Sequence, residues 1–193
     1  MTERHIDQRA REQQKHQQAS LIWITGLSAA GKSTIARALE DALYQRGHHS
    51  YLLDGDKVRT GLNKDLGFTI QHREENIRRL GEVSRLLVDA GLIVICAAIS
   101  PLRASRDHVR ALFDPSRYTE VYLSTPLAVC EKRDPKNLYQ QARAGKIAEF
   151  TGIASPYETP LNPEITLDTS TKNIDECVLT ILAFLHKHRG VHQ

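Results

Sequence analysis

Short apolar runs alternate along the chain with longer segments in which apolar residues recur every three or four positions. A short run bounded by turn residues is typical of a strand, and the longer spacing is typical of an amphipathic helix. The runs predict strands at 21–25, 51–54, 92–99, 120–123 and 164–167. The spacing predicts helices at 32–47, 73–90, 102–113 and 174–185. Such alternation predicts a doubly wound α/β fold with a parallel sheet of about five strands.

The run at 92–99 contains only apolar residues. In a parallel sheet that is covered by helices on both faces, a strand is apolar on both sides, so this run predicts such a strand. It is too short to cross a membrane, which takes about 20 apolar residues. We therefore expect no membrane partner.

The first twenty residues are polar and lack the apolar core that a signal peptide contains. They predict a polar tail or a solvated helix at 1–20, followed by a single domain at 21–193. Without a signal peptide or a membrane span, we expect a cytoplasmic protein.

The composition is that of a globular protein, with 25% charged residues and a formal net charge of +3. Lysine and arginine are scattered, whereas a nucleic-acid-binding protein concentrates them on one face, so we expect no nucleic-acid partner. No H-E-x-x-H motif occurs among the nine histidines, and metal ligation by histidine is not expected. Three cysteines without a C-x-x-C pair predict buried structural thiols: Cys96, Cys130 and Cys177.

The segment G-L-S-A-A-G-K-S-T follows the first predicted strand and precedes the first predicted helix. It fits the pattern G-x-x-x-x-G-K-[ST], in which backbone N–H groups surround the phosphates of a nucleoside triphosphate. Glycine permits the backbone angles that such a loop needs, the lysine supplies a positive charge, and the serine hydroxyl binds Mg²⁺. A chance glycine-rich turn is the alternative, which the flanking strand and helix disfavour. The residues predicted to bind ATP are Gly26, Leu27, Ser28, Ala29, Ala30, Gly31, Lys32, Ser33 and Thr34.

Two carboxylates, Asp54 and Asp56, come directly after the second predicted strand. In a parallel sheet they lie at the same edge as the phosphate loop, where ligands bind. One carboxylate can take the proton of an acceptor hydroxyl, and either can order Mg²⁺ and its waters. The alternative is that the pair only caps the next helix. The run at 92–99 ends in Ser100 and Pro101 without a carboxylate, which favours a small-molecule kinase over a switch or a motor.

A polar segment at about 131–150 contains the basic residues Arg133, Lys136, Arg143 and Lys146, together with a proline and a glycine that suit a hinge. A flap that closes over the triphosphate would stabilise charge on the transferring phosphoryl group and exclude water, which otherwise hydrolyses ATP. We call this segment the lid. A solvated surface helix is the alternative interpretation.

Several linked motifs over about 21–158 resemble those of the adenylyl-sulfate kinases. They are D-G-D-K-V-R-T-G-L-N-K-D-L-G-F, R-E-E-N-I-R-R, I-S-P, R-D-P-K-N-L-Y and F-T-G-I-A-S-P-Y-E. The resemblance implies a P-loop kinase fold and transfer of the γ-phosphoryl group of ATP to the 3′-hydroxyl of adenylyl sulfate, with Mg²⁺ as cofactor. The products would be ADP and 3′-phosphoadenylyl sulfate.

The resemblance also implies roles for individual residues. Lys32, Asp54 and Asp56 would be catalytic, with one of the carboxylates acting as the base. Ser33 and either Asp54 or Asp56 would bind Mg²⁺, directly or through water. Arg133 and Lys136 of the lid would join the ATP side. The acceptor side would comprise Asp54, Asp56, Arg59, Phe68, Arg73, Asn76, Ile99, Ser100, Lys136, Tyr139 and Phe150.

The side-chain chemistry suits these roles. Arginine forks match phosphate and sulfate oxygens, as expected of Arg59 and Arg73. Phe68 and Phe150 would sandwich the adenine, although the residues alone would predict two core aromatics. The family is commonly described with a phosphoserine at the position of Ser100. Direct in-line transfer needs no such intermediate, and the following proline favours a structural role in a turn.

Five positions depart from the common pattern of the family, and none of the changes removes a group assigned to the chemistry. Alanine replaces a common glycine at Ala29, lysine an asparagine at Lys57, and alanine a phenylalanine at Ala98. His72 and Ala154 each replace an aspartate. We expect these changes to affect substrate affinity more than the type of reaction.

Two other functions stay open on sequence alone. The first is a kinase of another small acceptor, such as a nucleoside monophosphate, shikimate or gluconate. The second is a regulatory nucleotide-binding protein without turnover. The resemblance implies a homodimer, and it raises an association with the ATP sulfurylase that makes adenylyl sulfate as a further expectation.

Overall fold

A computed structural model describes residues 6–189 of the chain. Five parallel strands form one sheet in the order β2-β3-β1-β4-β5. Both the fold class and the number of strands agree with the sequence prediction. The strands are β1 (Ser20–Gly26), β2 (Ser50–Asp54), β3 (Ile93–Ala97), β4 (Tyr118–Leu123) and β5 (Ile165–Leu167).

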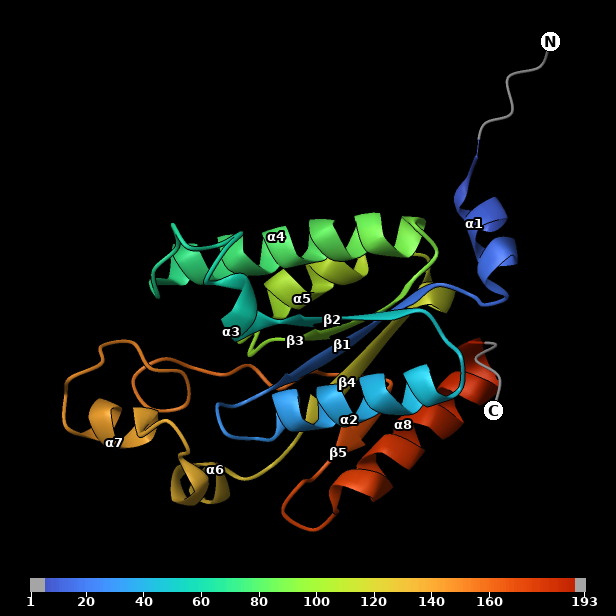
Figure 1. The fold of residues 1–193 in the computed structure, drawn as a ribbon. Helices are drawn as coiled ribbons and strands as arrows, with labels where there is room; N and C mark the ends of the chain where they lie inside the picture. The colour runs from blue at the N-terminus through green and yellow to red at the C-terminus, as the bar shows by residue number, and fades with distance from the viewer. Residues whose placement is uncertain (1–5, 190–193) are drawn as a thin grey trace.

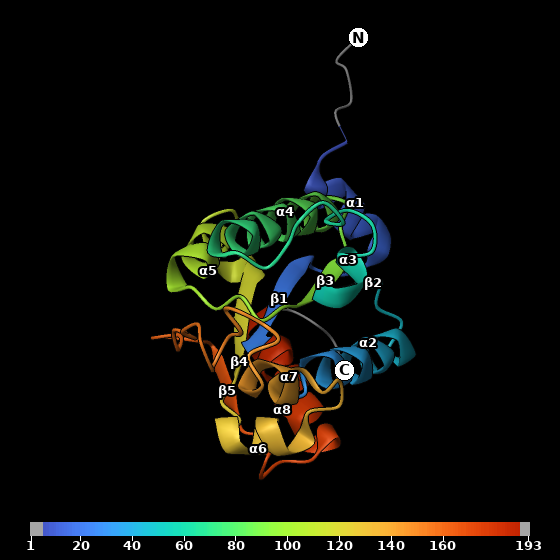
Figure 2. The ribbon, with the colours of Figure 1, turned by 90° about the vertical axis from the view of Figure 1, so that its left-hand side faces the viewer.

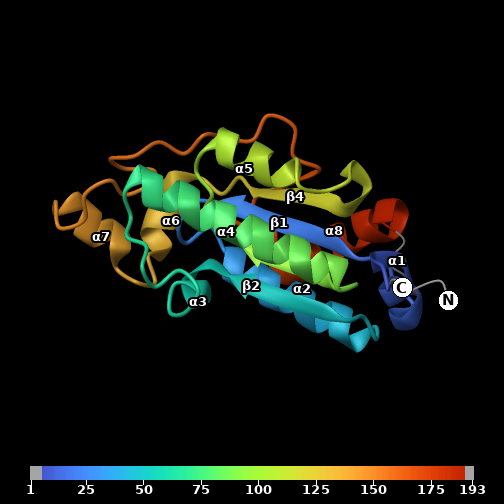
Figure 3. The same ribbon diagram turned by 90° about the horizontal axis from the view of Figure 1, so that it is seen from above.

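Helices cover both faces of the sheet (Figure 1), with α4 and α5 on one face and α2 and α8 on the other. Figure 3, seen from above, shows α4 and α5 lying over the strands. The four predicted helices are present, with ends that shift by a few residues. The helices are α1 (Gln8–Lys15), α2 (Lys32–Gln45), α3 (Gly55–Val58), α4 (Ile70–Asp89), α5 (Arg103–Arg110), α6 (Leu127–Arg133), α7 (Leu138–Arg143) and α8 (Ile174–Arg189), with a 3₁₀ turn η1 (Pro115–Arg117).

The central strand β1 is buried along its whole length and divides the apolar interior into two cores. Ile22 and Ile24 face α2 and α8, whereas Leu21 and Trp23 face α4. Alternate side chains of a strand point to opposite faces, so a strand covered on both sides must be apolar throughout. The same reason explains the apolar run that contains β3.

The polar segment before the sheet includes helix α1, which begins after the N-cap Asp7. Gln17 connects this segment to the domain, because its Nε2 donates to the carbonyl oxygens of His49 and Gly91 at 2.9 Å each. Strand β1 begins at Ser20, one residue earlier than predicted. Residues 1–5 of the predicted polar segment lie outside the described residues.

The phosphate loop, the start of α3 and the helices α6 and α7 all gather at the end of the sheet where the strands terminate (Figure 1). Figure 2, which looks onto this end, shows α6 and α7 in front of the sheet. Helix α1 lies at the opposite end. Between residues 6 and 189, no helix has the length and apolar character needed to cross a membrane.

Candidate active site

The phosphate loop connects β1 to α2 through two backbone conformations that ordinary residues avoid. Gly31 has φ 97° and Ala29 has φ 59°. A side chain at Gly26 would bring its Cβ within 2.8 Å of the Leu123 carbonyl oxygen, so only glycine fits there. Ala29 thus adopts the left-handed conformation without the freedom of glycine.

Lys32 is the first residue of α2, and its side chain folds back over the loop. Its Nζ donates to the carbonyl oxygens of Gly26 at 3.0 Å and Leu27 at 2.6 Å. Burial lowers the pKa of Lys32 from 10.5 to about 8, although Asp56 and Asp54 oppose this shift. A triphosphate held by the loop would restore the charge of this ammonium group.

The first turn of α2 presents backbone N–H groups that have no partner within the helix. With the helix dipole, these groups favour an anion at this position. Ser33 lies in this turn and is half-buried, whereas Thr34 is exposed. The turn therefore provides the features that a bound phosphate needs.

The residues present suit a Mg²⁺ ion that is carried by nucleotide phosphates. Within 6–189, no cluster of three His, Cys, Asp or Glu side chains exists that would bind a metal alone. Mg²⁺ usually keeps several waters and takes one or two protein ligands together with substrate phosphates. The Ser33 hydroxyl and a carboxylate from Asp54 or Asp56 make a donor set of this kind.

Asp54 and Asp56 follow β2 at the same edge of the sheet, but their surroundings differ. Asp54 is buried and caps α3, because its Oδ1 accepts the N–H of Asp56 at 3.0 Å. Its Oδ2 lies 3.7 Å from Arg37 of α2. Asp54 therefore caps the next helix, as the alternative predicted for the pair, and its predicted role toward Mg²⁺ or the acceptor stays a prediction. Asp56 is exposed and leaves its carboxylate available to a ligand.

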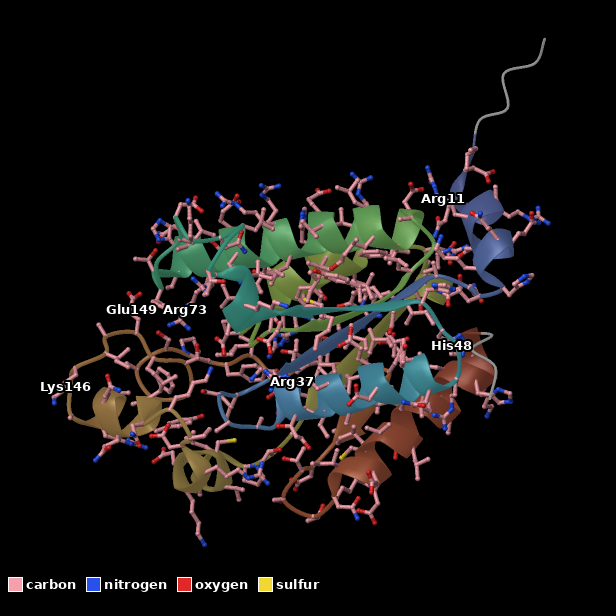
Figure 4. The ribbon with its side chains drawn as sticks, in the orientation of Figure 1. Arg11, Arg37, His48, Arg73, Lys146 and Glu149 are labelled. Atoms are coloured by element: carbon pink, nitrogen blue, oxygen red, sulfur yellow. The ribbon has the colours of Figure 1, made fainter. Side chains whose placement is uncertain are left out.

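The lid contains the end of α6 and the whole of α7, two short helices. Helical structure in this segment was predicted only by the alternative interpretation, a solvated surface helix. Lys136, between the two helices, forms an ion pair with Asp56. Arg133 reaches the phosphate loop and donates to Thr169 Oγ1 at 2.8 Å. Arg143 pairs with Glu131 on the lid itself, at 2.6 Å. Lys146 points away from the domain in Figure 4. Arg133 and Lys136, in contrast, contact the site, at the carbonyl oxygen of Ala29 and at Asp56 respectively.

Arg59 and Phe68 lie together between α3 and α4. The guanidinium of Arg59 sits over the Phe68 ring, 4.6 Å from its centre, and donates to the carbonyl oxygens of Leu66 and Gly67. Phe68 is 64% exposed, so the prediction of a core aromatic is wrong for this residue. An exposed ring that is held by a cation presents a flat face to a ligand.

Arg73, near the start of α4, joins both sides of the acceptor region. Its Nε donates to the Phe68 carbonyl oxygen at 2.7 Å, and its terminal nitrogens donate to Glu149 O and Thr151 Oγ1. Figure 4 shows Arg73 beside Glu149 at the lid. Burial lowers the pKa of Arg73, and the charge of Arg59 lowers it further.

Phe150, unlike Phe68, is 8% exposed. Its ring packs edge-on against Tyr139 of α7, with 5.0 Å between the ring centres. The Tyr139 hydroxyl donates to Ser28 O of the phosphate loop at 3.0 Å. The core prediction thus holds for Phe150, and Tyr139 connects it to the phosphate loop.

Asn76 of α4 is buried, and its Oδ1 accepts from Asn63 Nδ2 at 3.0 Å. Asn63 is fully buried as well. This contact attaches the segment after α3 to α4 beneath Arg59 and Phe68. We did not identify Asn63 from the sequence, since a single asparagine in a loop carries no local signal.

Ser100 is 1% exposed and lies in a network of hydroxyl groups. Its Oγ accepts from Trp23 Nε1 at 3.1 Å and donates to Thr25 Oγ1 at 2.9 Å. Thr25 in turn donates to the carbonyl oxygen of Ile99 at 2.7 Å. Ser100 has φ 41°, a strained conformation that its partners maintain. This hydroxyl is bonded to protein on both sides, which supports the structural role.

Comparisons with known proteins place most of the chain beside one family of kinases. The sequence profile of the family described as adenylylsulphate kinase matches residues 18–168. An adenylyl-sulfate kinase of Shewanella denitrificans is 61% identical over 180 residues, 93% of this chain and 88% of the relative. An APS kinase of Mycobacterium tuberculosis, solved in complex with AMPPNP and APS, is 44% identical with a TM-score of 0.84, covering 88% of this chain and 99% of that one.

A hexameric APS kinase of Thiobacillus denitrificans is 35% identical with a TM-score of 0.67 and covers 92% of this chain. This chain matches 30% of that longer one. The profile spans most of the sequence, and the identity to curated relatives extends over nearly the whole of it. The chain therefore belongs to the adenylylsulphate kinase family.

Proposed function

We propose that this protein transfers the γ-phosphoryl group of ATP to the 3′-hydroxyl of adenylyl sulfate, forming ADP and 3′-phosphoadenylyl sulfate. The observation that carries the proposal is one edge of the sheet at which a phosphate loop meets two carboxylates and an aromatic–arginine cluster. The loop suits a triphosphate. The cluster suits an acceptor that combines a flat base with anionic groups, as adenylyl sulfate does.

The phosphate loop and the lid bind and orient the donor. Backbone N–H groups at the start of α2 hold the β- and γ-phosphates, and Lys32 places its ammonium group against them. Arg133 and Lys136 bring positive charge from the lid toward the transferring group. With the lid closed, water is excluded and the acceptor hydroxyl is the available nucleophile.

We assign to Asp56 the role of the base that accepts the proton of the acceptor hydroxyl. Asp54 uses one oxygen to cap α3 and lies near Arg37, so it is engaged in holding the local structure. Asp56 is exposed at the same edge, and its carboxylate pairs with Lys136, a lid residue that is itself more than half exposed. A base must come within hydrogen-bond reach of the hydroxyl that it deprotonates, and Asp56 is free to do so.

Ser33 and one of the two carboxylates would hold Mg²⁺ with the nucleotide. The ion supplies charge neutralisation between the phosphate oxygens when it is bound. The chain's own residues perform the remaining work, which is to align the acceptor hydroxyl with the γ-phosphate.

On the acceptor side, Phe68 and Phe150 would contact the two faces of the adenine. Arg59 and Arg73 would bind the phosphate and sulfate oxygens, and both guanidinium groups are already positioned by backbone carbonyls. Shikimate and gluconate carry no aromatic base and would make no use of the aromatic pair. This observation favours adenylyl sulfate over them.

The decisive test of the proposal is ADP release with Mg²⁺ and ATP, measured with adenylyl sulfate, AMP, shikimate and gluconate in parallel. Release that requires adenylyl sulfate, with recovery of 3′-phosphoadenylyl sulfate, is the expected result. Release with another acceptor would assign the chain to a different substrate. Equal release without any acceptor would leave only a nucleotide-binding protein that hydrolyses ATP.

We further propose a cytoplasmic homodimer. The hexameric relative supports self-association in this family, and light scattering of the purified protein would measure the oligomeric state directly. An association with ATP sulfurylase would be tested by co-sedimentation of the two purified proteins. Co-sedimentation is expected only if the two active sites exchange adenylyl sulfate within a complex.

A further inference from the structure

Arg106 of α5 is an arginine inside the apolar interior, and no motif in the sequence pointed to it. Its side chain is 2% exposed. Two of its nitrogens donate to main-chain carbonyl oxygens, Nη1 to Ser100 O and Nη2 to Glu158 O, both at 2.6 Å. A buried guanidinium whose N–H groups donate to two backbone segments fixes the distance between those segments.

Both segments border the acceptor side of the site. Ser100 follows Ile99 at the end of β3, and Glu158 ends the stretch that begins with Phe150. Arg106 thus joins the turn after β3 to the segment that carries the buried aromatic ring. It lies outside the groups that would touch the substrate.

Glu158 is attached to the start of α5 by two more hydrogen bonds. Its backbone N–H donates to Pro101 O at 2.8 Å, and its Oε2 accepts from the N–H of Arg103 at 2.7 Å. At the other end of the same segment, Thr151 accepts from Arg73 of α4. The segment 151–158 is therefore held at its two ends by helices α4 and α5.

Between these ends the segment lines one side of an open pocket of about 520 Å³, which residues 124–127 and Leu27 of the phosphate loop also line. Near the end of the segment, Tyr157 stacks on Tyr122 with 6.0 Å between the ring centres, and its hydroxyl contacts Thr25 Oγ1 at 2.9 Å. The guanidinium of Arg106 lies over the same Tyr157 ring, 5.7 Å from its centre. Because the pocket leaves space beside the segment, its position depends on these contacts and on the anchors at its ends.

The charge of Arg106 is balanced inside the domain. Its Nε lies 3.0 Å from Glu120 of β4, whose other oxygen pairs with Arg110 at 3.1 Å. Arg110 also pairs with Glu164 at 2.5 Å. Two arginines and two glutamates thus compensate each other's charge. Burial raises the pKa of the Glu120 carboxyl, and the guanidinium of Arg106 opposes that rise.

We propose that Arg106, balanced by Glu120, is a positioning residue that sets the distance between the Ile99–Ser100 turn and the 151–158 segment, and thereby the fit of the acceptor. This inference rests on the proposed function for its kinetic readout. Loss of the fork lets the segment shift into the cavity and weakens acceptor binding. Within residues 6–189, the hydrogen bonds and the ion pair of Arg106 go to Ser100, Glu158 and Glu120 and not to the phosphate loop. We therefore expect little change in nucleotide affinity.

The test compares two variants that keep the interior neutral. Arg106→Lys retains the positive charge beside Glu120, but a single ammonium group cannot reproduce the fork. The double variant Arg106→Met with Glu120→Gln removes both charges together, which avoids an uncompensated buried carboxylate. Arg110→Lys is the matched control, because Arg110 belongs to the same charged cluster, bonds to neither segment and keeps its positive charge in this variant.

We expect KM for adenylyl sulfate to rise about 3- to 10-fold in Arg106→Lys and more than 10-fold in the double variant. The Kd of an unreactive ATP analogue should change less than 3-fold in both. A wild-type KM in both folded variants would overturn the proposal. So would an equal loss of donor and acceptor affinity, or a rise in KM in Arg110→Lys as large as in Arg106→Lys.

Amide hydrogen exchange separates this inference from the proposed function, because it needs no substrate. The N–H of Glu158 is protected by Pro101 O in the wild type. In Arg106→Lys it should exchange at least several-fold faster, with the first turn of α2 unchanged. Unchanged exchange at Glu158 would refute the anchor even if the enzyme acts on adenylyl sulfate. Faster exchange together with no turnover in the wild type would contradict the proposed function alone.

Discussion

Lys136 of the lid forms an ion pair with Asp56, the exposed carboxylate after β2, across 80 residues of sequence. Both side chains are more than half exposed, at 58% and 69%. An exposed pair contributes less than about 1 kcal/mol, so an incoming acceptor can displace it. The contact holds the lid near the acceptor carboxylate without locking it.

Replacing Lys136 by methionine should therefore alter catalysis and leave folding stability alone. We expect kcat/KM to fall about 10- to 100-fold, because a lid charge that faces the transferring phosphoryl group is lost. The free energy of unfolding should change by less than about 0.5 kcal/mol. Denaturant titration and steady-state kinetics measure the two effects. Lys146→Met is the control, and a loss of equal size in that variant would argue against a specific role for Lys136.

Asp56→Asn should separate binding from turnover. The amide keeps the size of the side chain but cannot accept the proton of the 3′-hydroxyl. We expect kcat to fall about 10²- to 10⁴-fold, while the affinity for an ATP analogue stays within a few-fold. Asp41→Asn, at an exposed position on α2, controls for loss of surface charge. Unchanged turnover in Asp56→Asn would move the base to Asp54 or to water.

Lys32 should take up a proton when the protein binds nucleotide. The pKa of this ammonium group is about 8 in the free protein because of burial, and a bound triphosphate raises it. Near pH 8 about half of the lysines are neutral before binding and charged afterwards, so about 0.5 proton enters per nucleotide. At pH 6.5 the group is charged in both states and contributes almost nothing.

Isothermal titration with MgATP in buffers of different ionisation enthalpy measures this uptake. Lys32→Arg provides the control, since arginine stays charged throughout the range and the variant should lose the uptake at pH 8. Uptake that persists in Lys32→Arg would place the titrating group elsewhere.

The two phenylalanines should respond differently to substitution. Phe68 is largely exposed, so Phe68→Ala should raise KM for adenylyl sulfate about 5- to 100-fold with almost no change in melting temperature. Phe150 is buried against Tyr139, so Phe150→Leu should also cost about 1 kcal/mol of folding stability. Thermal melts alongside acceptor kinetics distinguish the cases. A wild-type KM in both variants would contradict the proposal that the adenine binds between these two rings.

Ser100→Ala tests whether this serine carries a phosphoryl group. The alanine leaves Trp23 Nε1 without its acceptor, which costs about 1–3 kcal/mol of stability. Turnover should fall less than 10-fold, because direct transfer does not use the hydroxyl. Mass spectrometry of the wild type during turnover should find no phosphate on Ser100. Trapped phosphoserine with loss of activity in folded Ser100→Ala would reverse this assignment.

Much of the fold follows from the alternation of short apolar runs with helix-spaced segments along the chain. The apolar run at 92–99 has to be covered on both faces, and β3 inside it is fully buried. The loop that begins at Gly26 needs glycine where the backbone comes close to β4 and where it adopts left-handed angles. The strand before this loop and the helix after it are both evident from the adjoining sequence. The carboxylates at 54 and 56 are placed at the ligand-binding edge by strand direction alone.

Other assignments depend on contacts between distant segments. Phe68 and Phe150 look alike as apolar residues, yet one ring is exposed beside Arg59 and the other is buried under α7. Asp54 and Asp56 are two residues apart, but capping of α3 engages the first and not the second. Local periodicity carries no information on which member of such a pair is covered.

The sequence by itself determined the sheet, the phosphate loop and the identity of the family, because these depend on spacing along the chain and on conformations that only certain residues adopt. The tertiary structure alone decided that Ser100 is bonded on both sides and that Lys136 meets Asp56. It also decided that Arg106 joins Ser100 to Glu158. Such contacts link residues that are far apart in sequence, and their stability depends on burial and charge compensation that exist only when the chain is folded.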